Sequence, residues 1–349
     1  MISDNIVNMN VVLANGTTVK VNENTNTDLW WAMRGAGHNF GIVTSYDLKI
    51  HPVEAETWYY KKYFFKGDQL EPLFEQLNKF QQNGTSPNKL RGADFGIYTM
   101  NTSVSETEAT ISWTFVYAAP QSDVEPLLAP FDQLNAAVKQ DATFHYPELF
   151  DVLGGGLTSE LCKPNRTHIV STAGLQVYNA TAQRQIYDLF NRKVAQHPEL
   201  GTTRLMHEGY SVEGVRNVNP DQSAFPLRDD YLLMYGIPCS LFSTQEILDN
   251  NDDTNIYHLC RSFDGTPKAD SGLEDFTKQW ARETRDLWNA GQPERLPTTY
   301  LNYAFGDESL ESMYGHEPWR LEKLRALKAQ YDPHNRLAYY NPIVPLNKK

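Results

Sequence analysis

Apolar and polar positions along the start of the chain follow a pattern that predicts a hairpin, a short helix and a strand. In residues 7–21 apolar side chains recur at every second position, and Asn15-Gly16 is a strong tight-turn signal. Residues 26–37 change to the helical spacing of apolar positions. Residues 40–50 return to alternation and stop before a proline, so we expect a strand there.

The short helix carries end signals of its own. Asn26 or Thr27 can cap its first turn, and Leu29 and Met33 share one face. Gly35 follows the last periodic residue, and glycine there readily adopts the left-handed backbone that ends many helices. We therefore expect the helix to end at Gly35.

Beyond Pro52 the pattern changes to longer strands that alternate irregularly with amphipathic helices. Strands are expected at 56–65, 90–100, 108–118, 168–178, 203–212 and 229–238. Helices are expected at 68–84, 121–138, 180–196 and 269–290. This order predicts the α+β class, with an antiparallel sheet backed by helices rather than a regular βαβ winding.

The last part of the chain, residues 298–343, has a different character. An apolar face runs from Leu321 to Leu327 at helical spacing. That helix is expected to end at Asp332, because the following Pro333 disfavours helical backbone in the residue before it.

Length and charge narrow the classes of protein. A chain of 349 residues favours two domains over one. The net charge is −12, and without a stripe of Lys and Arg we expect no nucleic-acid partner. No run approaches the length of apolar residues needed to span a bilayer, so we expect no membrane partner. Aromatic residues make up 12%, which suits a large core and also a pocket for a flat ligand.

Cysteine usage gives no sign of a metal. Cys162, Cys239 and Cys260 lack metal-like spacing, so we expect no metal site. Three buried thiols and one disulfide with a free thiol are both compatible with this count. The disulfide pairing and the oligomeric state stay undetermined by the sequence.

Glycosylation sequons point to a secretory history. Five occur, at Asn15, Asn83, Asn101, Asn165 and Asn179, so we expect a glycoprotein. The first ten residues lack the basic start and apolar stretch of a signal peptide. The sequons favour a secreted protein and the first ten residues do not, so the two predictions of localisation conflict.

A glycine cluster, Gly35, Gly37 and Gly41, lies between the short helix and the next strand. It is not a dinucleotide fingerprint, because the spacing differs and the glycines follow a helix and open a strand. It is not a P-loop, because no Gly-Lys-Ser/Thr follows. Two interpretations remain open: a helix end with a tight turn, or a loop whose bare backbone approaches a flat cofactor.

This segment and the end of the chain together resemble a known family. Residues 28–52, DLWWAMRGAGHNFGIVTSYDLKIHP, are similar to the closing motif of the FAD-binding domain in the vanillyl-alcohol oxidase / p-cresol methylhydroxylase superfamily, with Ala36 replacing one glycine. Residues 300–315 and 331–343 resemble the Y-x-N-Y and Y-D-P-x-N segments of its berberine-bridge-enzyme-like branch. The closest resemblance is to fungal members of secondary metabolism.

The resemblance implies three parts. Residues 1–52 would be the C-terminal part of a PCMH-type FAD-binding domain, and 53–297 a substrate domain. Residues 298–349 would return to the FAD-binding domain. The family also has a preceding segment with the pyrophosphate-binding loop and the histidine that attaches to FAD, which this sequence lacks. We expect exposed apolar surface on the 5–50 hairpin and strand, where such a segment would pack.

The resemblance implies FAD as cofactor, bound non-covalently at most, because no histidine lies in an attachment motif. The implied reaction is oxidation of a small alcohol, sugar or natural-product intermediate, with hydride passing to flavin N5 and O₂ reoxidising the flavin. Asn302 is expected to orient the site. The residues implied to contact FAD are Gly37, Asn39, Phe40, Gly41, Ile42, Val43, Asn302 and Asn335. A truncated pseudoenzyme, a non-redox isomerase or cyclase, and a binding protein with the same pocket remain alternatives.

The candidates for the catalytic base lie on one strand and in the Y-x-N-Y segment. Alternation along 203–212 puts Glu208 and Tyr210 on one face and His207 on the other. The motif match adds Tyr300 and Tyr303 as candidates close to flavin and substrate. Each also has a structural interpretation, as a satisfied strand residue or as aromatic packing, and both interpretations stay open.

Overall fold

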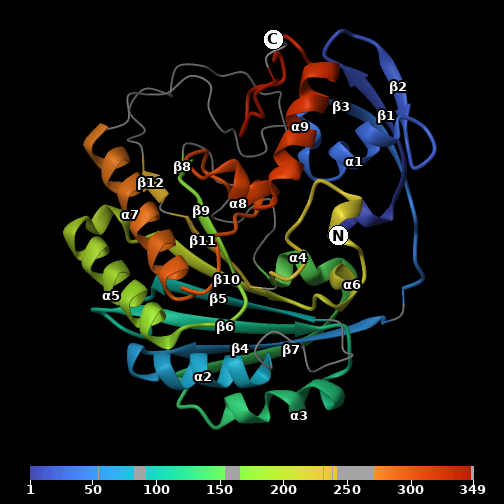
Figure 1. Ribbon diagram of the computed structural model, residues 1–349. Coiled ribbons are helices and arrows are strands. Elements are labelled where there is room, and N and C mark those ends of the chain that lie inside the picture. The colour runs from blue at the N-terminus through green and yellow to red at the C-terminus, as the bar shows by residue number, and fades with distance from the viewer. Residues whose placement is uncertain are drawn as a thin grey trace, which may run out of the picture.

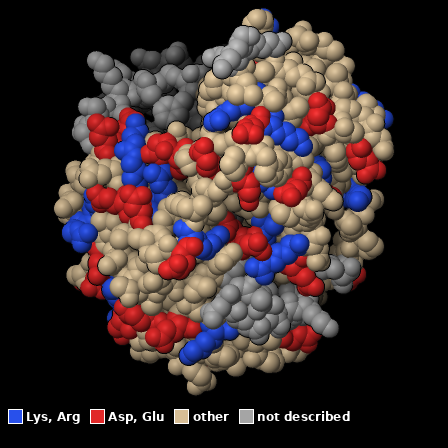
Figure 2. Space-filling view, in the orientation of Figure 1, with Lys and Arg blue, Asp and Glu red and all other residues tan. Residues whose placement is uncertain are grey.

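A computed structural model describes residues 1–53, 55–81, 92–153, 166–230, 232–237, 239–241 and 271–346. Figure 1 shows a small lobe that holds both termini and a larger lobe built on one sheet. We call them the terminal lobe (1–50 and 299–346) and the sheet lobe (57–290). Charged side chains of both signs are interspersed on the face drawn in Figure 2. Among the described residues no helix is long and apolar enough to cross a membrane.

The terminal lobe begins with the predicted hairpin. Strands β1 (Ile6–Leu13) and β2 (Thr18–Val21) pair antiparallel around Gly16, whose φ of +86° suits the tight turn. Strand β3 (Gly41–Leu48) pairs with the other side of β1, so the order is β2-β1-β3. Helices α1 (Thr27–Ala36) and α9 (Pro318–Tyr331) pack against this sheet around one apolar cluster. Segments from the two ends of the chain therefore share one core.

The sheet lobe is built on seven antiparallel strands in the order β7-β4-β6-β5-β10-β11-β9. Its inner strand β6 is rich in β-branched and aromatic residues and is buried throughout. The strands are β4 (Thr57–Phe65), β5 (Gly92–Met100), β6 (Ala109–Tyr117), β7 (Val138–His145), β9 (Ser171–Leu175), β10 (Arg204–Tyr210) and β11 (Leu232–Ile237). A separate pair joins β8 (Arg166–His168) to β12 (Cys239–Leu241).

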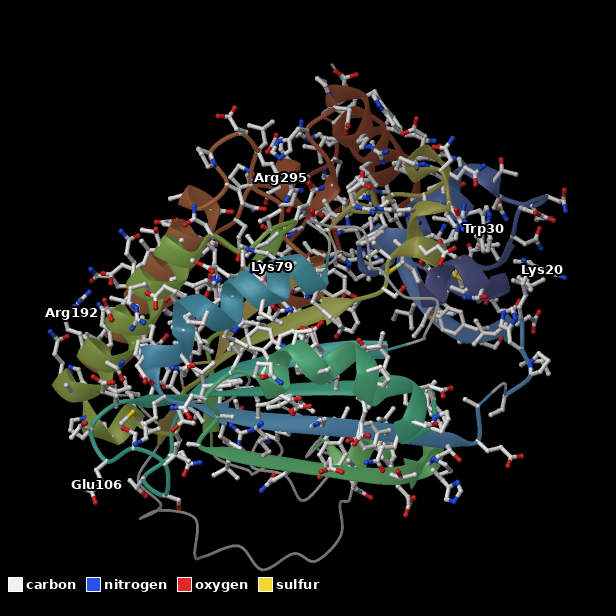
Figure 3. The ribbon with its side chains drawn as sticks, turned by 90° about the horizontal axis from the view of Figure 1, so that it is seen from below. Lys20, Trp30, Lys79, Glu106, Arg192 and Arg295 are labelled. Carbon is white, nitrogen blue, oxygen red and sulfur yellow. The ribbon has the colours of Figure 1, made fainter. Side chains whose placement is uncertain are left out.

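Four amphipathic helices bury their apolar faces against one face of this sheet. They form one core with strand residues such as Tyr63, Trp113 and Leu205. Figure 3 shows two of them, marked by Lys79 on α2 and Arg192 on α5, which contact each other. The four are α2 (Leu70–Phe80), α3 (Gln121–Asp132), α5 (Ala180–Gln196) and α7 (Ser271–Ala290). The α+β prediction is thus confirmed.

Several short elements connect the longer ones. The short α-helices are α4 (Leu149–Val152), α6 (Glu213–Arg216) and α8 (Leu310–Tyr314). The 3₁₀ turns are Ile2–Asn5, Gly37–Asn39, Gly67–Gln69, Tyr146–Glu148, Pro198–Leu200, Pro220–Gln222 and Leu301–Tyr303.

Two sequence predictions were wrong in detail. The helix predicted for 121–138 ends at Asp132, and the strand β7 follows from Val138 to His145. This edge strand is mostly exposed on both faces, so it lacks the alternation that reveals a strand. Asn26 precedes α1 but its side chain makes no capping bond; its backbone is left-handed, with φ +51°, whereas a capping residue usually has extended backbone, and its Nδ2 donates to Lys20 O.

Some sequence features lie outside the described residues. These are Cys162, Cys260, Asn83, Asn165 and the predicted helix end at Gly84. For Cys239 the backbone alone is described.

The expected exposed apolar surface on the first strands is confirmed. Ile42, Tyr46 and Leu48 of β3 are 63%, 53% and 48% exposed, and Ile50 just beyond it is 94% exposed. These side chains cluster on one edge strand, which distinguishes them from singly scattered surface residues.

The two apolar clusters are built from different parts of the sequence. One contains residues of 59–288, and the other contains residues of the two chain ends together with Ala224. Ala224 is the exception, because it lies far from both ends in sequence. The domain boundaries drawn from the resemblance stay a prediction.

Asp94 is a carboxyl group buried under the helices of the sheet lobe. Its Oδ1 accepts from Trp113 Nε1 at 3.0 Å and its Oδ2 from Gln81 Nε2 at 3.2 Å. Burial raises the pKa of Asp94 to about 6, although these two neutral donors oppose the shift. The folded state therefore holds a proton on Asp94 more tightly than the unfolded chain does.

Replacing Asp94 should change how stability depends on pH. Because the folded pKa is raised, the stabilising contribution of protonated Asp94 is complete below about pH 4 and is lost as pH rises through about 6. The free energy of unfolding of Asp94→Asn, relative to wild type, should therefore rise by roughly 2 kcal/mol between about pH 4 and pH 7. Urea denaturation across this range measures it. The exposed Asp275→Asn is the control, and parallel profiles for wild type and Asp94→Asn would contradict the prediction.

Candidate functional site

The residues of the candidate site meet where strand β10 faces the segment that follows α7. The alternation of β10 places His207 under the helices and Glu208 on the opposite face, as predicted. Glu208 is 5% exposed. Its carboxylate meets Tyr210 from the same strand and Tyr303 from the far end of the sequence.

Two phenol groups surround the Glu208 carboxylate. Tyr210 Oη donates to Glu208 Oε2 at 2.8 Å, and Tyr303 Oη lies 3.4 Å from both carboxylate oxygens. Tyr300 packs edge-on against Tyr303 with ring centroids 5.3 Å apart, and Asn302 Nδ2 donates to Tyr300 Oη at 2.9 Å. The structure thus brings together all four predicted catalytic candidates and Asn302.

The electrostatics of this cluster favour protonated phenols. Burial raises the pKa of Tyr210 well above its ordinary value, and the nearby Glu208 charge and hydrogen bond raise it further. Burial also raises the pKa of Tyr300, with a smaller contribution from Glu208 and an opposing hydrogen bond from Asn302. Tyr210 and Tyr303 donate their hydroxyl hydrogens to Glu208, whereas the Tyr300 hydroxyl accepts from Asn302.

His207 belongs to the core of the sheet lobe. Burial lowers its pKa to about 3, so the imidazole is neutral. A ring nitrogen lies 2.9 Å from Gln183 Oε1, and the rings of Tyr98 and Trp113 are 4.8 and 5.5 Å away. Its Nδ1 is buried and has no hydrogen-bond partner among the described residues, so the contacts support a core position in which only one ring nitrogen is hydrogen-bonded.

The Tyr300–Tyr303 turn is fixed to the sheet through the residues just before it. Gly174 N on β9 donates to Thr298 O at 3.0 Å, and Thr298 Oγ1 donates to Asp230 Oδ2 at 2.6 Å. Arg295 forms an ion pair with Asp230 at 2.5 Å. A side chain on Gly174 would collide with Asp230 and Thr298, so this glycine allows the close approach.

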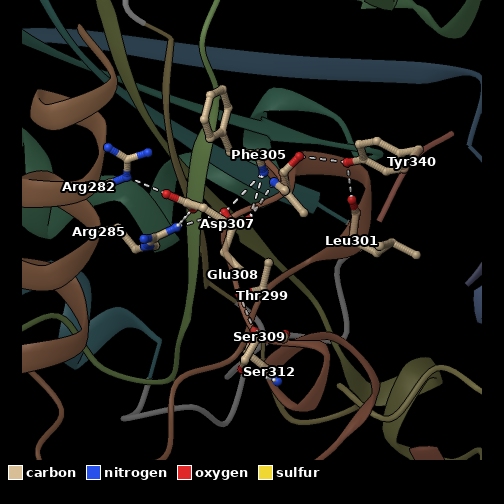
Figure 4. Close-up of polar contacts among 12 residues, drawn as sticks. Arg282, Arg285, Thr299, Leu301, Phe305, Asp307, Glu308, Ser309, Ser312 and Tyr340 are labelled. Atoms are coloured by element: carbon tan, nitrogen blue, oxygen red, sulfur yellow. Dashed lines mark hydrogen bonds and ion pairs between the residues drawn. The ribbon is translucent and has the colours of Figure 1, made fainter. Parts of the chain in front are cut away.

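The residues after the turn are held by the helix α7. Figure 4 shows Asp307 between Arg282 and Arg285, at 2.5 and 2.6 Å. The Glu308 carboxylate accepts from the backbone N–H of Phe305 at 3.0 Å. The turn is therefore anchored on both sides, which limits the freedom of its tyrosines.

The glycine cluster packs against other parts of the chain. A Cβ on Gly35 would lie 2.5 Å from Phe225 N, and one on Gly41 would collide with Val11. Gly37 has only the flexible side chain of Met33 in reach. The main chain at Arg34 and Gly35 breaks the helix, with φ +137° at Gly35, as the predicted helix end requires.

A buried lysine closes the glycine loop against the C-terminal segment. Lys328 Nζ, fully buried, donates to Asn39 O, Asp332 Oδ2 and Leu337 O, each at 2.8 Å. Asn39 Oδ1 accepts from Ile343 N at 2.9 Å. The Asn39 side chain is therefore engaged with the protein itself.

Tyr340 links this loop to the tyrosine turn. Its hydroxyl lies 2.6 Å from Leu301 O and 2.8 Å from Ala304 O. Its ring lies edge-on to His38 of the loop, with centroids 5.7 Å apart. The two segments that carry the implied FAD contacts are thus joined in space.

Some residues implied to contact FAD are buried inside the protein, and others have exposed or unpaired groups. Phe40 and Asn39 are fully buried, whereas Ile42 is 63% exposed and Val43 is partly exposed. Asn335 has φ +51°, and its buried Oδ1 has no hydrogen-bond partner among the described residues. An unsatisfied buried oxygen and an exposed apolar strand fit a flat, polar-edged cofactor. The contacts themselves stay a prediction.

Other site features were not found from the sequence. The pair Lys328 and Asp332 has a visible i,i+4 spacing, but this spacing alone does not distinguish a buried pair from a surface one. No sequence pattern predicted the ion pair of Asp230 and Arg295, because these residues are far apart in the sequence. Within the described residues no group of three His, Cys, Asp or Glu is placed to hold a metal ion.

Comparison with known proteins supports the resemblance. A family profile described as "Berberine and berberine like" matches residues 299–343. The FAD-linked oxidoreductase anuG of Penicillium roqueforti is 51% identical over 99% of this chain and 62% of its own length. The FAD-linked oxidoreductase OXR2 of Pyricularia oryzae is 43% identical over 98% and 62%, respectively. The chain thus spans less than two thirds of the length of these relatives.

Solved structures share the fold at low identity. The glucooligosaccharide oxidase of Acremonium strictum has a TM-score of 0.72 at 19% identity, covering 99% of this chain and 67% of that one. The xylooligosaccharide oxidase of Myceliophthora thermophila C1, solved with xylobiose, has a TM-score of 0.70 at 20% identity, with coverage of 99% and 67%. These likenesses support the architecture and leave the substrate undefined.

Removing the buried lysine should strongly destabilise the terminal lobe. Lys328→Met leaves Asp332 charged and buried without its cation, so the free energy of unfolding should fall by about 3–5 kcal/mol. Lys323→Met on the same helix removes only a cation over the Trp31 ring and should cost no more than about 1 kcal/mol. Urea denaturation compares the two. Equal losses would show that the buried pair is not a key contact.

Proposed function

Because this chain is a relative of the berberine-bridge-enzyme-like, FAD-linked oxidoreductases, we propose that it serves an FAD-dependent oxidation at the Glu208 site. The substrate class is a small alcohol, sugar or natural-product intermediate, and O₂ is the final electron acceptor. The homology supports FAD use, and the xylobiose-bound neighbour supports a hydroxyl-bearing substrate.

The observation that carries the proposal is a buried carboxylate between two phenols. Glu208 comes from the sheet and Tyr303 from the berberine-like segment, so the cluster exists only when both parts fold together. A surface carboxylate would need no such enclosure. A buried carboxylate with hydroxyl donors is suited to accept a proton from a substrate hydroxyl.

Each residue of the cluster has a distinct role in this proposal. Glu208 takes the proton from the substrate hydroxyl on one of its carboxylate oxygens. Tyr210 donates to Oε2 and keeps the carboxylate oriented. Tyr303 and Tyr300 border the site with protonated hydroxyls, and Asn302 fixes Tyr300.

FAD, when bound, supplies the acceptor for the hydride that leaves the substrate carbon. The exposed Ile42, the partly exposed Val43, Asn335 with its unsatisfied Oδ1, and Asn302 are the groups available to hold it. Gly37, Gly41, Phe40 and Asn39 would support the loop behind them. Attachment is non-covalent in this proposal.

The visible absorption spectrum is the first test. After incubation with FAD and gel filtration, the protein should retain flavin bands, and acid precipitation should release a yellow supernatant. Coloured precipitate would disprove non-covalent binding. A colourless protein that ignores added FAD would disprove the assignment of this chain as a flavin-binding unit.

Loss of the proposed base should slow substrate oxidation. In FAD-loaded protein, Glu208→Gln should lower the rate of anaerobic flavin bleaching by about 10²- to 10⁴-fold with either xylobiose or benzyl alcohol as probe. Glutamine keeps the shape and can still accept from Tyr210, so the fold should persist. Glu322→Gln, an exposed carboxylate on α9, is the control. A variant at residue 208 that bleaches as fast as wild type would exclude Glu208 as the base.

A further inference from the structure

The connection between β10 and β11 is much longer than these strands require. The two strands are adjacent and antiparallel, so a turn of two to five residues would join them. Instead residues 211–230, here called the inter-lobe strap, leave the sheet lobe after Tyr210. Figure 1 shows the strap in yellow after α6, running beside the terminal lobe and returning to the sheet.

The middle of the strap is fixed inside the terminal lobe. Trp31 Nε1 of α1 donates to Asp221 O at 2.8 Å, and Ala224 N donates to Trp31 O at 3.1 Å. The buried Arg320 of α9 pairs with Asp221 at 2.7 Å. Ala224 is fully buried in the apolar cluster of that lobe. Hydrogen bonds, an ion pair and burial thus hold the strap to both α1 and α9.

Gly35 provides the space that this attachment needs. A Cβ there would lie 2.5 Å from Phe225 N and 2.8 Å from Ala224 C, which are backbone atoms that cannot rotate away. Its φ of +137° is also unfavourable for any residue with a side chain. The glycine that the sequence predicted as the end of the short helix therefore also makes room for the strap.

The strap places one aromatic ring against the tyrosine turn. Phe225 lies edge-on to Tyr300, with centroids 6.2 Å apart and ring planes at 86°. On the strap itself, the guanidinium of Arg228 lies 5.3 Å from the centre of the Phe225 ring. Arg228 is held by Asp4 of the terminal lobe at 2.6 and 3.0 Å. The Phe225 ring is thus set by the terminal lobe rather than by the sheet.

Both ends of the strap reach the candidate site. It leaves the sheet at Tyr210, which donates to Glu208. It returns at Asp230, which holds Thr298 and Arg295 just before Tyr300. A shift of the strap would therefore act on Tyr300 through Phe225 and through Asp230 together.

We propose that Phe225 is a positioning residue for Tyr300. Gly35 leaves room for the strap backbone to pack against α1, and through this packing the terminal lobe determines the position of the Tyr300–Tyr303 turn. The proposal rests on the proposed function for its catalytic meaning, because it names a residue that acts on that site through Tyr300. Phe225 itself takes no part in proton or hydride transfer.

The test places 3-fluorotyrosine at position 300 and records its ¹⁹F resonance in the full chain. Phe225→Leu removes the ring that faces Tyr300, so the resonance should move by more than its linewidth. Phe225→Tyr keeps the ring and should return the resonance close to the wild-type position. Gly35→Ala should also displace the resonance, because the added Cβ would collide with the backbone of Ala224 and Phe225 and shift the strap.

Gly16→Ala is the matched control for Gly35→Ala. Gly16 also has a positive φ, +86°, but nothing lies within 4 Å of an added Cβ. This variant should be strained in its backbone alone and should leave the Tyr300 resonance in place. If Gly35→Ala does not fold, the Phe225 pair still decides the matter. An unchanged resonance in folded Phe225→Leu would overturn the proposal.

Activity separates this proposal from the proposed function. In FAD-loaded protein, Phe225→Leu should lower kcat with xylobiose by up to about 10²-fold, because small misplacements at a site have large effects on rate. If no variant, wild type included, oxidises any probe while the resonance moves as expected, the function fails and the positioning role stands. If oxidation is normal and the resonance of Phe225→Leu is unmoved, the positioning role alone fails.

Discussion

The structure depends on one buried cation, Lys328, which holds the beginning of the chain to its end. An ammonium group without water is stable only if it is fully paired, and this one donates to the Asp332 carboxylate and to two backbone carbonyls. One of those carbonyls belongs to Asn39 in the glycine loop. The burial of Asp332 opposes its ionisation, but the hydrogen bonds from Lys328, Leu337 and Arg336 outweigh this and lower its pKa. The Asp332 carboxylate therefore stays ionised beside Lys328, and the glycine loop has a fixed partner.

Because the two chain ends share a core, the candidate site can draw on both lobes. Glu208 and Tyr210 come from a strand in the middle of the sheet, whereas Tyr300 and Tyr303 come from the segment that enters the terminal lobe. Contacts on either side of this segment, at Thr298 and at Asp307, limit its movement. The carboxylate and the phenols are thus brought together by the way the two lobes pack, and not by closeness in sequence.

The inter-lobe strap gives the glycine cluster a physical explanation that the family resemblance did not contain. Gly35 fits the strap and Gly41 fits β1, so two of the three glycines are required by packing within the chain. Both interpretations of the cluster are compatible, because the packing of Gly35 and Gly41 leaves the neighbouring strand residue Ile42 exposed.

The sequence by itself determined most of the local elements and which residues of a strand share a face. Alternation separated Glu208 from His207, the turn signal placed the first hairpin, and the proline after Asp332 ended α9, because these features depend on a few neighbouring residues. Only the tertiary structure decided the strand order, the edge strand β7, the burial of Lys328 and the contact of Gly35 with Phe225. The strand order and the Gly35 contact depend on partners up to hundreds of residues apart, which periodicity does not encode. The strength of the Lys328–Asp332 pair depends on burial, because an i,i+4 ion pair is much stronger away from water than on the surface.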